Sequence, residues 1–486
     1  MLFNTLQFAL FFLITLAVYW SLPGDRWRQP FLLLGSLFFY GYWDWRFVLL
    51  LLVVIGSSYG FALAMARAHA RGRRSGALLA TACAVNLGLL FVFKYCNFFA
   101  DSLKVAMERF GIDAPWSTLH ILLPVGVSFY VFQSLTYLIN VHRRKLEADR
   151  NFVKIALYIS FFPHLVAGPI IHATDFLWQL RETRRWDPTM FLEGTQKFIL
   201  GFFMKSVFAD NIAVFVDPVY ADLGAYDNVS ILAASFGFYC QIYFDFAGYS
   251  LMAIGITNQL GYWLPDNFNY PYRATSVVDF WRRWHISLST WLRDYLYISL
   301  GGNRGSRLFQ YRNLMLTMLL GGLWHGASWN FVLWGGLHGL ALVVAHAWRS
   351  AHQAMGLRWP IPPVAGIVTA WLATQIFVLL CWIPFRATTF AQTGEALRAV
   401  LWLRPDADLT RAAIPWLVLV LPVLVDTFIL GRKHGGQPVT NPWLGYATMG
   451  VAFLIALLFM FVGTKPFIYF QFQPGLPPIF ASRSTA

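Results

Sequence analysis

His325 lies in an apolar stretch, residues 319–339, that reads LLGGLWHGASWNFVLWGGLHG. Because an imidazole gains and loses a proton near neutral pH, a histidine in this setting is a candidate general base. Trp324 and Trp329 flank it, and apolar and small residues enclose it. The small residues Gly321, Gly322, Gly326 and Ala327 permit close backbone approach. The competing interpretation is a histidine that hydrogen-bonds between packed helices. His338 would lie about 220° further around the same helix, so we expect it to be a packed residue.

Residues 264–307 form a long polar segment that carries six arginines. Its pattern predicts a helix from about Asp279 to Leu296, with one face formed by Trp281, His285, Leu288 and Leu292. Arg282, Arg283 and Arg293 would attract an acyl donor that bears phosphates, or an acidic carrier protein. An interfacial amphipathic helix whose arginines contact lipid phosphates explains the same pattern.

Asp245 lies inside an apolar stretch, residues 241–250, that reads QIYFDFAGYS. An ionisable residue at the centre of a membrane span costs about 2.5–3.5 kcal/mol, so it is a candidate functional residue. The alternative is a carboxylate that pairs with Arg282 or Arg293 and holds helices together.

The chain lacks the sequence motifs of several enzyme classes. The chain contains no G-x-x-x-x-G-K-[ST], no dinucleotide-binding fingerprint, no H-E-x-x-H and no G-x-S-x-G. Its four cysteines have no metal-ligand spacing. These absences disfavour an ATP-driven pump, a metalloenzyme and a hydrolase with its own serine triad, and we expect no bound metal or cofactor.

The composition predicts that membrane helices position these residues. Of the 486 residues, 58% are hydrophobic and 12% are charged, and the mean hydropathy is +0.54. A soluble protein has about a quarter charged residues, so a compact soluble fold and a disordered chain are both excluded. We expect an all-α polytopic membrane protein with about 11–12 transmembrane helices. The predicted spans are 3–20, 31–42, 46–66, 77–95, 118–138, 190–215, 230–258, 309–323, 327–347, 362–383, 411–430 and 443–463.

The net charge of +14 comes from basic residues that cluster in short loops, near residues 67–74, 143–150 and 181–185. Cytoplasmic loops beside anionic lipid have this bias, so nucleic-acid binding is disfavoured and both termini are predicted outside. Residues 155–171 lie between two basic loops and contain Pro163, so we expect a re-entrant segment. Irregular backbone at that depth requires a surrounding of protein or a water-filled cavity.

The chain resembles the membrane-bound O-acyltransferase (MBOAT) family, and more narrowly its bacterial branch typified by alginate O-acetyltransferase. Sister branches serve peptidoglycan and teichoic acid. The stretches that carry the resemblance are 38–47, 161–170, 241–250, 267–306, 313–339 and 466–472. On this basis the chain divides into N-terminal helices (1–150), a catalytic core (151–350) and C-terminal helices with an aromatic tail (351–486).

The resemblance implies a ring of helices with re-entrant segments around a central tunnel, in which a buried histidine lies. The invariant histidine of the family corresponds to His325, and the second motif histidine to His285. A cytoplasmic thioester, acetyl-CoA or an acyl-carrier protein, would meet an acceptor hydroxyl from the outer side, with His325 as general base. The implied location is the bacterial inner membrane, and the implied partner is a periplasmic O-acetyltransferase.

The stretch PFIYFQF, residues 466–472, resembles a tail in which a tyrosine is a proposed acyl acceptor, here Tyr469. An interfacial aromatic belt is the alternative explanation. The chain departs from the family at Leu251, where relatives usually have aspartate, which leaves the role of that position open.

Two other functions compete with polysaccharide O-acetylation. A polysaccharide or lipid transporter would show paired broken helices in two related halves, and the sequence has no such halves. Acylation of a lipid or of peptidoglycan, or transfer of D-alanine to teichoic acid, is compatible with the same residues.

Overall fold

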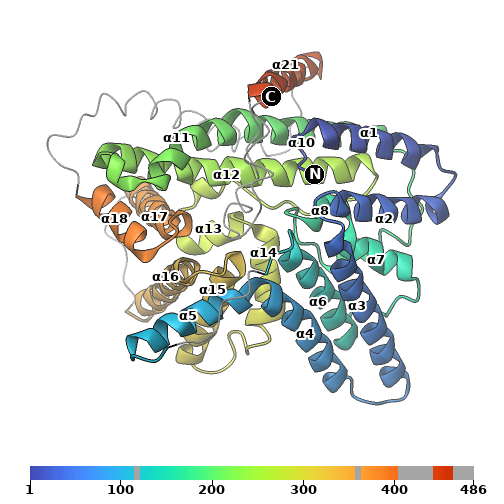
Figure 1. Ribbon diagram of the computed structural model, residues 1–486, viewed down its shortest axis with the longest axis horizontal. Coiled ribbons are helices and arrows are strands. Elements are labelled where there is room, and N and C mark those ends of the chain that lie inside the picture. Colours follow the sequence, from blue (N-terminus) through green and yellow to red (C-terminus); the bar gives the residue numbers. More distant parts are fainter. Residues whose placement is uncertain (114–120, 356–362, 403–441, 463–486) are drawn as a thin grey trace. The chain divides into compact units, whose positions relative to one another are not determined.

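The computed structural model describes residues 1–113, 121–355, 363–402 and 442–462, and within these ranges it contains helices and no strand (Figure 1). Six of the described helical stretches are long and apolar enough to cross a membrane: Arg46–Ala70, Gly76–Arg109, Pro188–Ala221, Asn228–Gln259, Trp329–Met355 and Val364–Arg386. The predicted all-α polytopic membrane fold is therefore confirmed. The predicted span at 411–430 lies outside the described residues, and the ring around a tunnel stays a prediction.

The described chain forms two compact units. The first comprises Met1–Ile199 and Tyr249–Pro265, and the second comprises the described parts of Leu200–Gly248 and Asp266–Ile468. The helices of the first unit are α1 (Leu6–Ser21), α2 (Asp25–Gly41), α3 (Arg46–Ala70), α4 (Gly76–Leu90), η1 (Phe91–Tyr95), α5 (Cys96–Arg109), α6 (Val127–His142), α7 (Phe152–Ser160), α8 (Phe162–Leu165) and α9 (Ala173–Leu177). Helices α10 (Pro188–Phe203) and α12 (Asn228–Gln259) contribute to both units.

The second unit contains the candidate site residues that the structure describes. Its further helices are η2 (Met204–Ala209), α11 (Asp210–Ala221), η3 (Leu223–Ala225), η4 (Pro271–Arg273), α13 (Val277–Arg283), α14 (Ile286–Trp291), η5 (Leu292–Tyr297), α15 (Arg307–His325), α16 (Trp329–Met355), α17 (Pro363–Arg386), α18 (Phe390–Leu401) and α21 (Pro442–Val462). Side-chain caps fix several helix starts. Ser276 accepts from Asp279 N at the start of α13, and Ser306 accepts from Phe309 N at the start of α15.

In the first unit, helix α6 packs against α3 and α4 (Figure 1). Small polar side chains connect these apolar helices. The Ser134 hydroxyl donates to Asn86 Oδ1 at 3.0 Å and lies 2.5 Å from the Ser58 hydroxyl. Small residues that hydrogen-bond across helices are typical of packing within membranes.

The segment predicted to be re-entrant is broken, as its proline suggested. Helix α7 ends at Ser160 and α8 has only four residues, and both are largely buried. Neither is near the ~20 residues that a membrane span requires. The break is confirmed, and the same-side entry and exit stay predictions.

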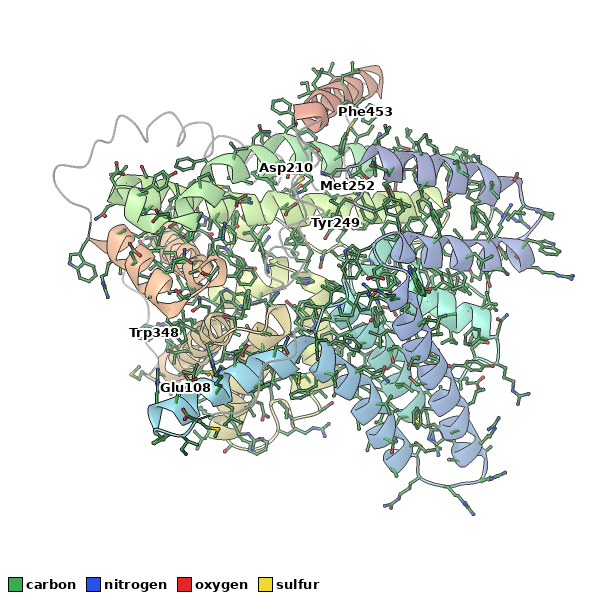
Figure 2. All side chains as sticks on the ribbon, viewed as in Figure 1. Glu108, Asp210, Tyr249, Met252, Trp348 and Phe453 are labelled. Carbon is green, nitrogen blue, oxygen red and sulfur yellow. The ribbon has the colours of Figure 1, made fainter. Side chains whose placement is uncertain are left out.

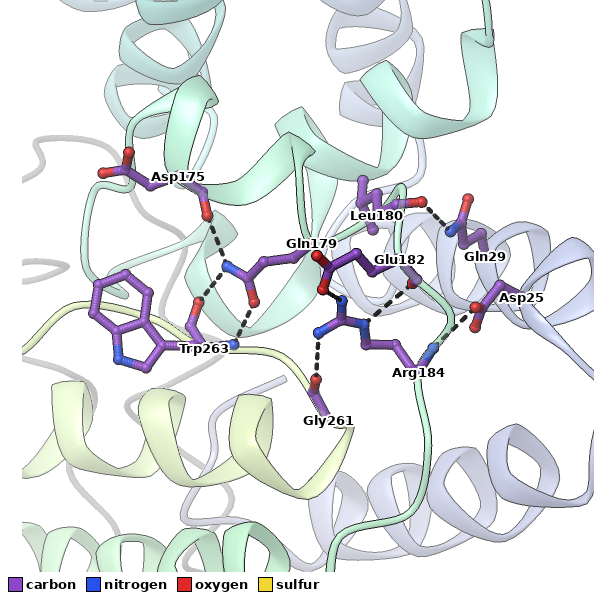
Figure 3. Close-up of polar contacts among 9 residues, drawn as sticks. All are labelled: Asp25, Gln29, Asp175, Gln179, Leu180, Glu182, Arg184, Gly261 and Trp263. Atoms are coloured by element: carbon purple, nitrogen blue, oxygen red, sulfur yellow. Dashed lines mark hydrogen bonds and ion pairs between the residues drawn. The ribbon is translucent and has the colours of Figure 1, made fainter.

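The third basic loop is tied into the first unit by hydrogen bonds (Figure 3). Arg184 bonds to Glu182 at 2.9 Å and to the Gly261 carbonyl at 3.4 Å, and its backbone N–H donates to Asp25 at 3.0 Å. Gln179 donates to the Trp263 carbonyl at 3.1 Å and accepts from the Trp263 N–H at 2.8 Å. Arg184, one of the basic residues of this loop, therefore links the loop to the segments that contain Asp25 and Gly261.

The charge partner of Asp245 is Lys205, and not Arg282 or Arg293 as the sequence suggested. Lys205 Nζ lies 2.7 Å from carboxylate oxygens of both Asp245 and Asp210, and all three side chains are buried. Figure 2 labels Asp210, the first residue of α11. A buried charge is tolerated when it is paired, so this cluster links η2 to α12.

A glycine one turn after Asp245 lets these helices approach. A Cβ built on Gly248 would lie 2.7 Å from the Gly201 carbonyl oxygen and 3.1 Å from Lys205 N. Only a residue without a side chain fits this distance. Further along the second unit, the Phe453 ring of α21 lies 6.2 Å from that of Phe202 (Figure 2).

Helices α15 and α16 pack backbone against backbone, as their glycines predicted. A Cβ on Gly322 would lie 2.2 Å from the Phe331 carbonyl oxygen, and one on Gly335 would lie 2.3 Å from that of Met318. This contact fixes the end of α15, where His325 lies, against the start of α16.

We expect Gly322→Ala to lower the melting temperature of the purified full-length protein in detergent. Its methyl group would press on backbone that cannot move away, at a cost of about 3 kcal/mol. The matched control is Gly336→Ala, whose Cβ would lie 3.5 Å from Leu319 Cδ2, an ordinary contact. Equal melting temperatures for the two variants would contradict the proposed backbone contact.

Candidate active site

His325 is enclosed by aromatic rings in the second unit. It is the last residue of α15 and is 6% exposed. Its ring centroid lies 5.0 Å from that of Trp324, 5.0 Å from that of Trp334 and 5.3 Å from that of Phe385, all with edge-on geometry. The imidazole is therefore held in an apolar enclosure, where electrostatic interactions are stronger than in water.

The two tryptophans that flank His325 in sequence have different surroundings. Trp324 is 5% exposed and contacts the imidazole, whereas Trp329, the first residue of α16, is 50% exposed. Sequence reasoning did not single out Trp334. The available signal was its position four residues before His338, which places the two on one face of α16.

His338 is a packed residue, as the spacing suggested. It is fully buried, and its ring lies 4.8 Å from that of Trp334, which also contacts His325. The Trp281 indole N–H donates to His338 Nδ1 at 3.3 Å. An indole nitrogen can only donate, so the neutral His338 ring carries its proton on Nε2.

The single helix predicted from Asp279 to Leu296 is wrong, because the chain breaks at His285. Helix α13 ends at Arg283, and α14 begins at Ile286. Between them His285 adopts the left-handed conformation, with φ 43° and ψ 54°. Such a backbone is rare outside glycine and often occurs at functional sites, where neighbouring structure holds it.

The break places His285 close to His325. The centroids of the two imidazoles lie 6.5 Å apart, and His285 is fully buried. His285 Nδ1 lies 3.0 Å from Asn267 Oδ1, and the Phe246 ring lies 4.6 Å from the imidazole between centroids, with edge-on geometry. The separation exceeds that of two hydrogen-bonded imidazoles.

The three arginines proposed to bind the donor differ in how they are paired. Arg283 forms an ion pair with Asp279 at 3.0 Å, four residues earlier on α13. Arg293 bonds to Asp294 at 2.7 Å, and this bond raises the pKa of the guanidinium above its ordinary value. Arg282 is exposed on α13. The described part of the chain contains no group of three His, Cys, Asp or Glu side chains that could hold a metal.

Tyr469, the acyl-acceptor candidate of the tail, lies outside the described residues. Among the described residues, the candidate site consists of the aromatic enclosure and the two histidines. A base within reach of a hydroxyl in a dry, enclosed site can promote acyl transfer.

Comparisons with known proteins identify the family of the chain. The model of the membrane-bound O-acyltransferase (MBOAT) family matches residues 37–383. Probable alginate O-acetylase AlgI of Azotobacter vinelandii is 38% identical over 449 residues, which cover 91% of this chain and 87% of that protein. Its counterpart in Pseudomonas aeruginosa is 39% identical over 446 residues, 90% of this chain and 83% of that protein. Peptidoglycan O-acetyltransferase of Helicobacter pylori is 31% identical over 490 residues, 91% of each chain.

The family match includes both histidines of the candidate site. It extends over more than half of the chain, and relatives with acetyltransferase names are similar along nearly the whole length. The chain itself belongs to the membrane-bound O-acyltransferase family and is an O-acyltransferase.

Proposed function

We propose that this O-acyltransferase moves an acetyl group from a cytoplasmic thioester, acetyl-CoA or an acyl-carrier protein, across the membrane for O-acetylation of an exported polysaccharide. Alginate or another exopolysaccharide is the proposed end acceptor. The observation that carries the chemistry is the buried pair of His285 and His325, with centroids 6.5 Å apart. The names of the relatives at 38% and 39% identity support the acetyl group and the polysaccharide.

The reaction needs one proton acceptor and two oriented substrates. An acceptor hydroxyl gives its proton to an imidazole of the pair, and its oxygen forms a bond to the thioester carbonyl carbon. The C–S bond then breaks, and the leaving sulfur takes the proton from the imidazole. A positioned base contributes about 10²–10⁴-fold, and proximity supplies much of the rest. The family resemblance implies His325 as this base and His285 as the second residue.

Arg282, Arg283 and Arg293 lie in the segment proposed to face the donor on the cytoplasmic side of the bacterial inner membrane, in contact with membrane lipids. Both termini would then lie in the periplasm, where a partner O-acetyltransferase would receive the group. In this arrangement the acetyl group crosses the membrane by the transfer itself.

Peptidoglycan O-acetylation is the second candidate. It is favoured by the relative with that name, at 31% identity over 91% of each chain. This relative is less similar to the chain than the alginate O-acetylases are, so peptidoglycan O-acetylation is the weaker candidate. Both functions use the same acyl chemistry, and they differ in the final glycan.

We expect His325→Ala to abolish O-acetylation of the extracellular glycans of a bacterium that depends on this gene. Loss of a general base lowers the rate by about 10²–10⁴-fold. Alkali-released acetate per mass of glycan measures the effect, and an immunoblot of membranes confirms the amount of protein. His352→Ala, at the end of α16, is the control and should retain wild-type acetylation. Unchanged acetylation in His325→Ala at normal protein levels would contradict the mechanism.

We propose further that the Tyr469 phenol receives the acetyl group on the outer side and passes it on. Removing only the hydroxyl, with Tyr469→Phe, should then abolish glycan acetylation and leave the protein in the membrane. The same acetate assay checks this result. Retained acetylation would assign the tail to the interfacial aromatic belt.

A further inference from the structure

Arg386, the residue after Phe385, forms an ion pair that has no part in the acyl-transfer steps above. Its Nη2 atom lies 3.1 Å from Asp217 Oδ1 of α11. We propose that Arg386 is a positioning residue for His325, because its ion pair fixes the end of α17 and keeps the Phe385 ring against the imidazole. The proposal rests on the proposed role of His325 as general base and deepens it, because it names what holds that imidazole in place.

The imidazole of His325 depends on its neighbours for its orientation. The torsion that turns an imidazole about its Cβ–Cγ bond is broad, so the side chain itself does not select one angle. Of the rings around it, Trp324 comes from the same helix, Trp334 from α16 and Phe385 from α17. The Phe385 ring lies edge-on to the imidazole, with centroids 5.3 Å apart. The orientation of the imidazole therefore depends on where the end of α17 lies.

The Phe385 ring also packs against other walls of the enclosure. Its centroid lies 5.1 Å from that of Trp334 and 4.9 Å from that of Phe331. Phe331 in turn fills the space that a Cβ on Gly326 would need, directly after His325. Protein interiors are close-packed, so a displaced Phe385 ring would leave a gap beside the imidazole.

The end of α17 needs hydrogen bonds from outside the helix. Pro384 has no N–H, so it makes no hydrogen bond to the preceding turn. The last carbonyls of a helix also lack partners within it. Directly after the helix, the Ala387 carbonyl accepts a hydrogen bond from Asn330 Nδ2, near the start of α16, at 2.8 Å. This bond ties the end of α17 to α16.

Arg386 ties the same end of α17 to α11 and α12. Its guanidinium carbon lies 5.1 Å from the ring centroid of Tyr220 and 5.9 Å from that of Phe238, within the range of cation–π contacts. The side chains of Arg386 and Asp217 are only 14% and 24% exposed. An ion pair shielded from water attracts more strongly than one on the surface, and an arginine that is both paired and stacked is held in one geometry. The backbone position of Phe385, the preceding residue, is fixed with it.

The test measures glycan acetate per amount of membrane protein in variants of Arg386. Arg386→Met keeps most of the side-chain stem and removes the charge. We expect acetylation to fall about 10–100-fold, since a misplacement of about 1 Å can cost about 100-fold. Arg386→Lys keeps a cation beside Asp217, so we expect it to recover most of the lost acetylation. Arg398→Met, which removes an exposed arginine of α18, is the control and should retain wild-type acetylation.

A double-mutant cycle shows whether Arg386 acts through Phe385. Phe385→Leu removes the ring that faces His325, and we expect a loss at least as large as that of Arg386→Met. If the ion pair serves to place this ring, the variant with both substitutions loses no more acetylation than Phe385→Leu alone. Losses that multiply, at equal amounts of protein in the membrane, would overturn the proposal.

A second measurement does not depend on activity. In the purified full-length protein labelled with ¹³C at histidine Cε1, the signal absent from His325→Ala identifies His325. Phe385→Leu should shift this signal, because the magnetic effect of the neighbouring aromatic ring is lost. We expect Arg386→Met to shift it in the same direction and Arg386→Lys to leave it close to its wild-type position. An unmoved His325 signal in Arg386→Met would overturn the proposal, whatever the activity of that variant.

The His325→Ala variant separates the role of Arg386 from the proposed function. If His325→Ala retained acetylation, His325 would not be the general base, and the proposed function would fail even if the signal shifts were as expected. If His325→Ala abolished acetylation while the His325 signal did not respond to Arg386→Met, only the role of Arg386 would fail.

Discussion

The direct backbone contact between α15 and α16 is the constraint on which the site depends. Gly322 and Gly335 leave no space for a side chain between the helices. This contact holds His325, at the end of α15, against Trp334 and, beyond it, His338. Interhelical packing in membranes relies on such small residues, because apolar lipid tails provide no hydrophobic drive for association.

Buried polar groups in the second unit compensate charges and fix which ring nitrogens carry protons. Lys205 pairs with Asp210 at the start of α11 and with Asp245 within α12, so these buried charges compensate one another. Asn267 satisfies one nitrogen of His285 and leaves the other open, and Trp281 does the same for His338 with the opposite tautomer. The second unit thus contains one histidine whose second ring nitrogen is an acceptor, His285, and one whose second ring nitrogen is a donor, His338.

Composition and motifs predicted the all-α membrane fold and the close approach at the glycines, because these depend on local residue types. The catalytic roles of His325 and His285 stay predictions. Composition and motifs did not predict the break at His285, since one left-handed residue interrupts an otherwise helical pattern. Contacts between distant residues were also missed. The Lys205 partner of Asp245 and the Asn267 bond to His285 join segments whose spacing in sequence gives no signal. Asn267 stands within the resembling stretch 267–306, but its residue type alone did not distinguish it.

The central claim is that His285 and His325 act on one reacting group. The most direct measurement is a double-mutant cycle, with glycan acetylation measured in His285→Ala, His325→Ala and the double variant at equal protein levels. Residues that act as a unit give strongly non-additive losses. We predict that the double variant loses no more activity than the more damaging single variant. Losses that multiply in the double variant would show that the two histidines act independently and would contradict the account.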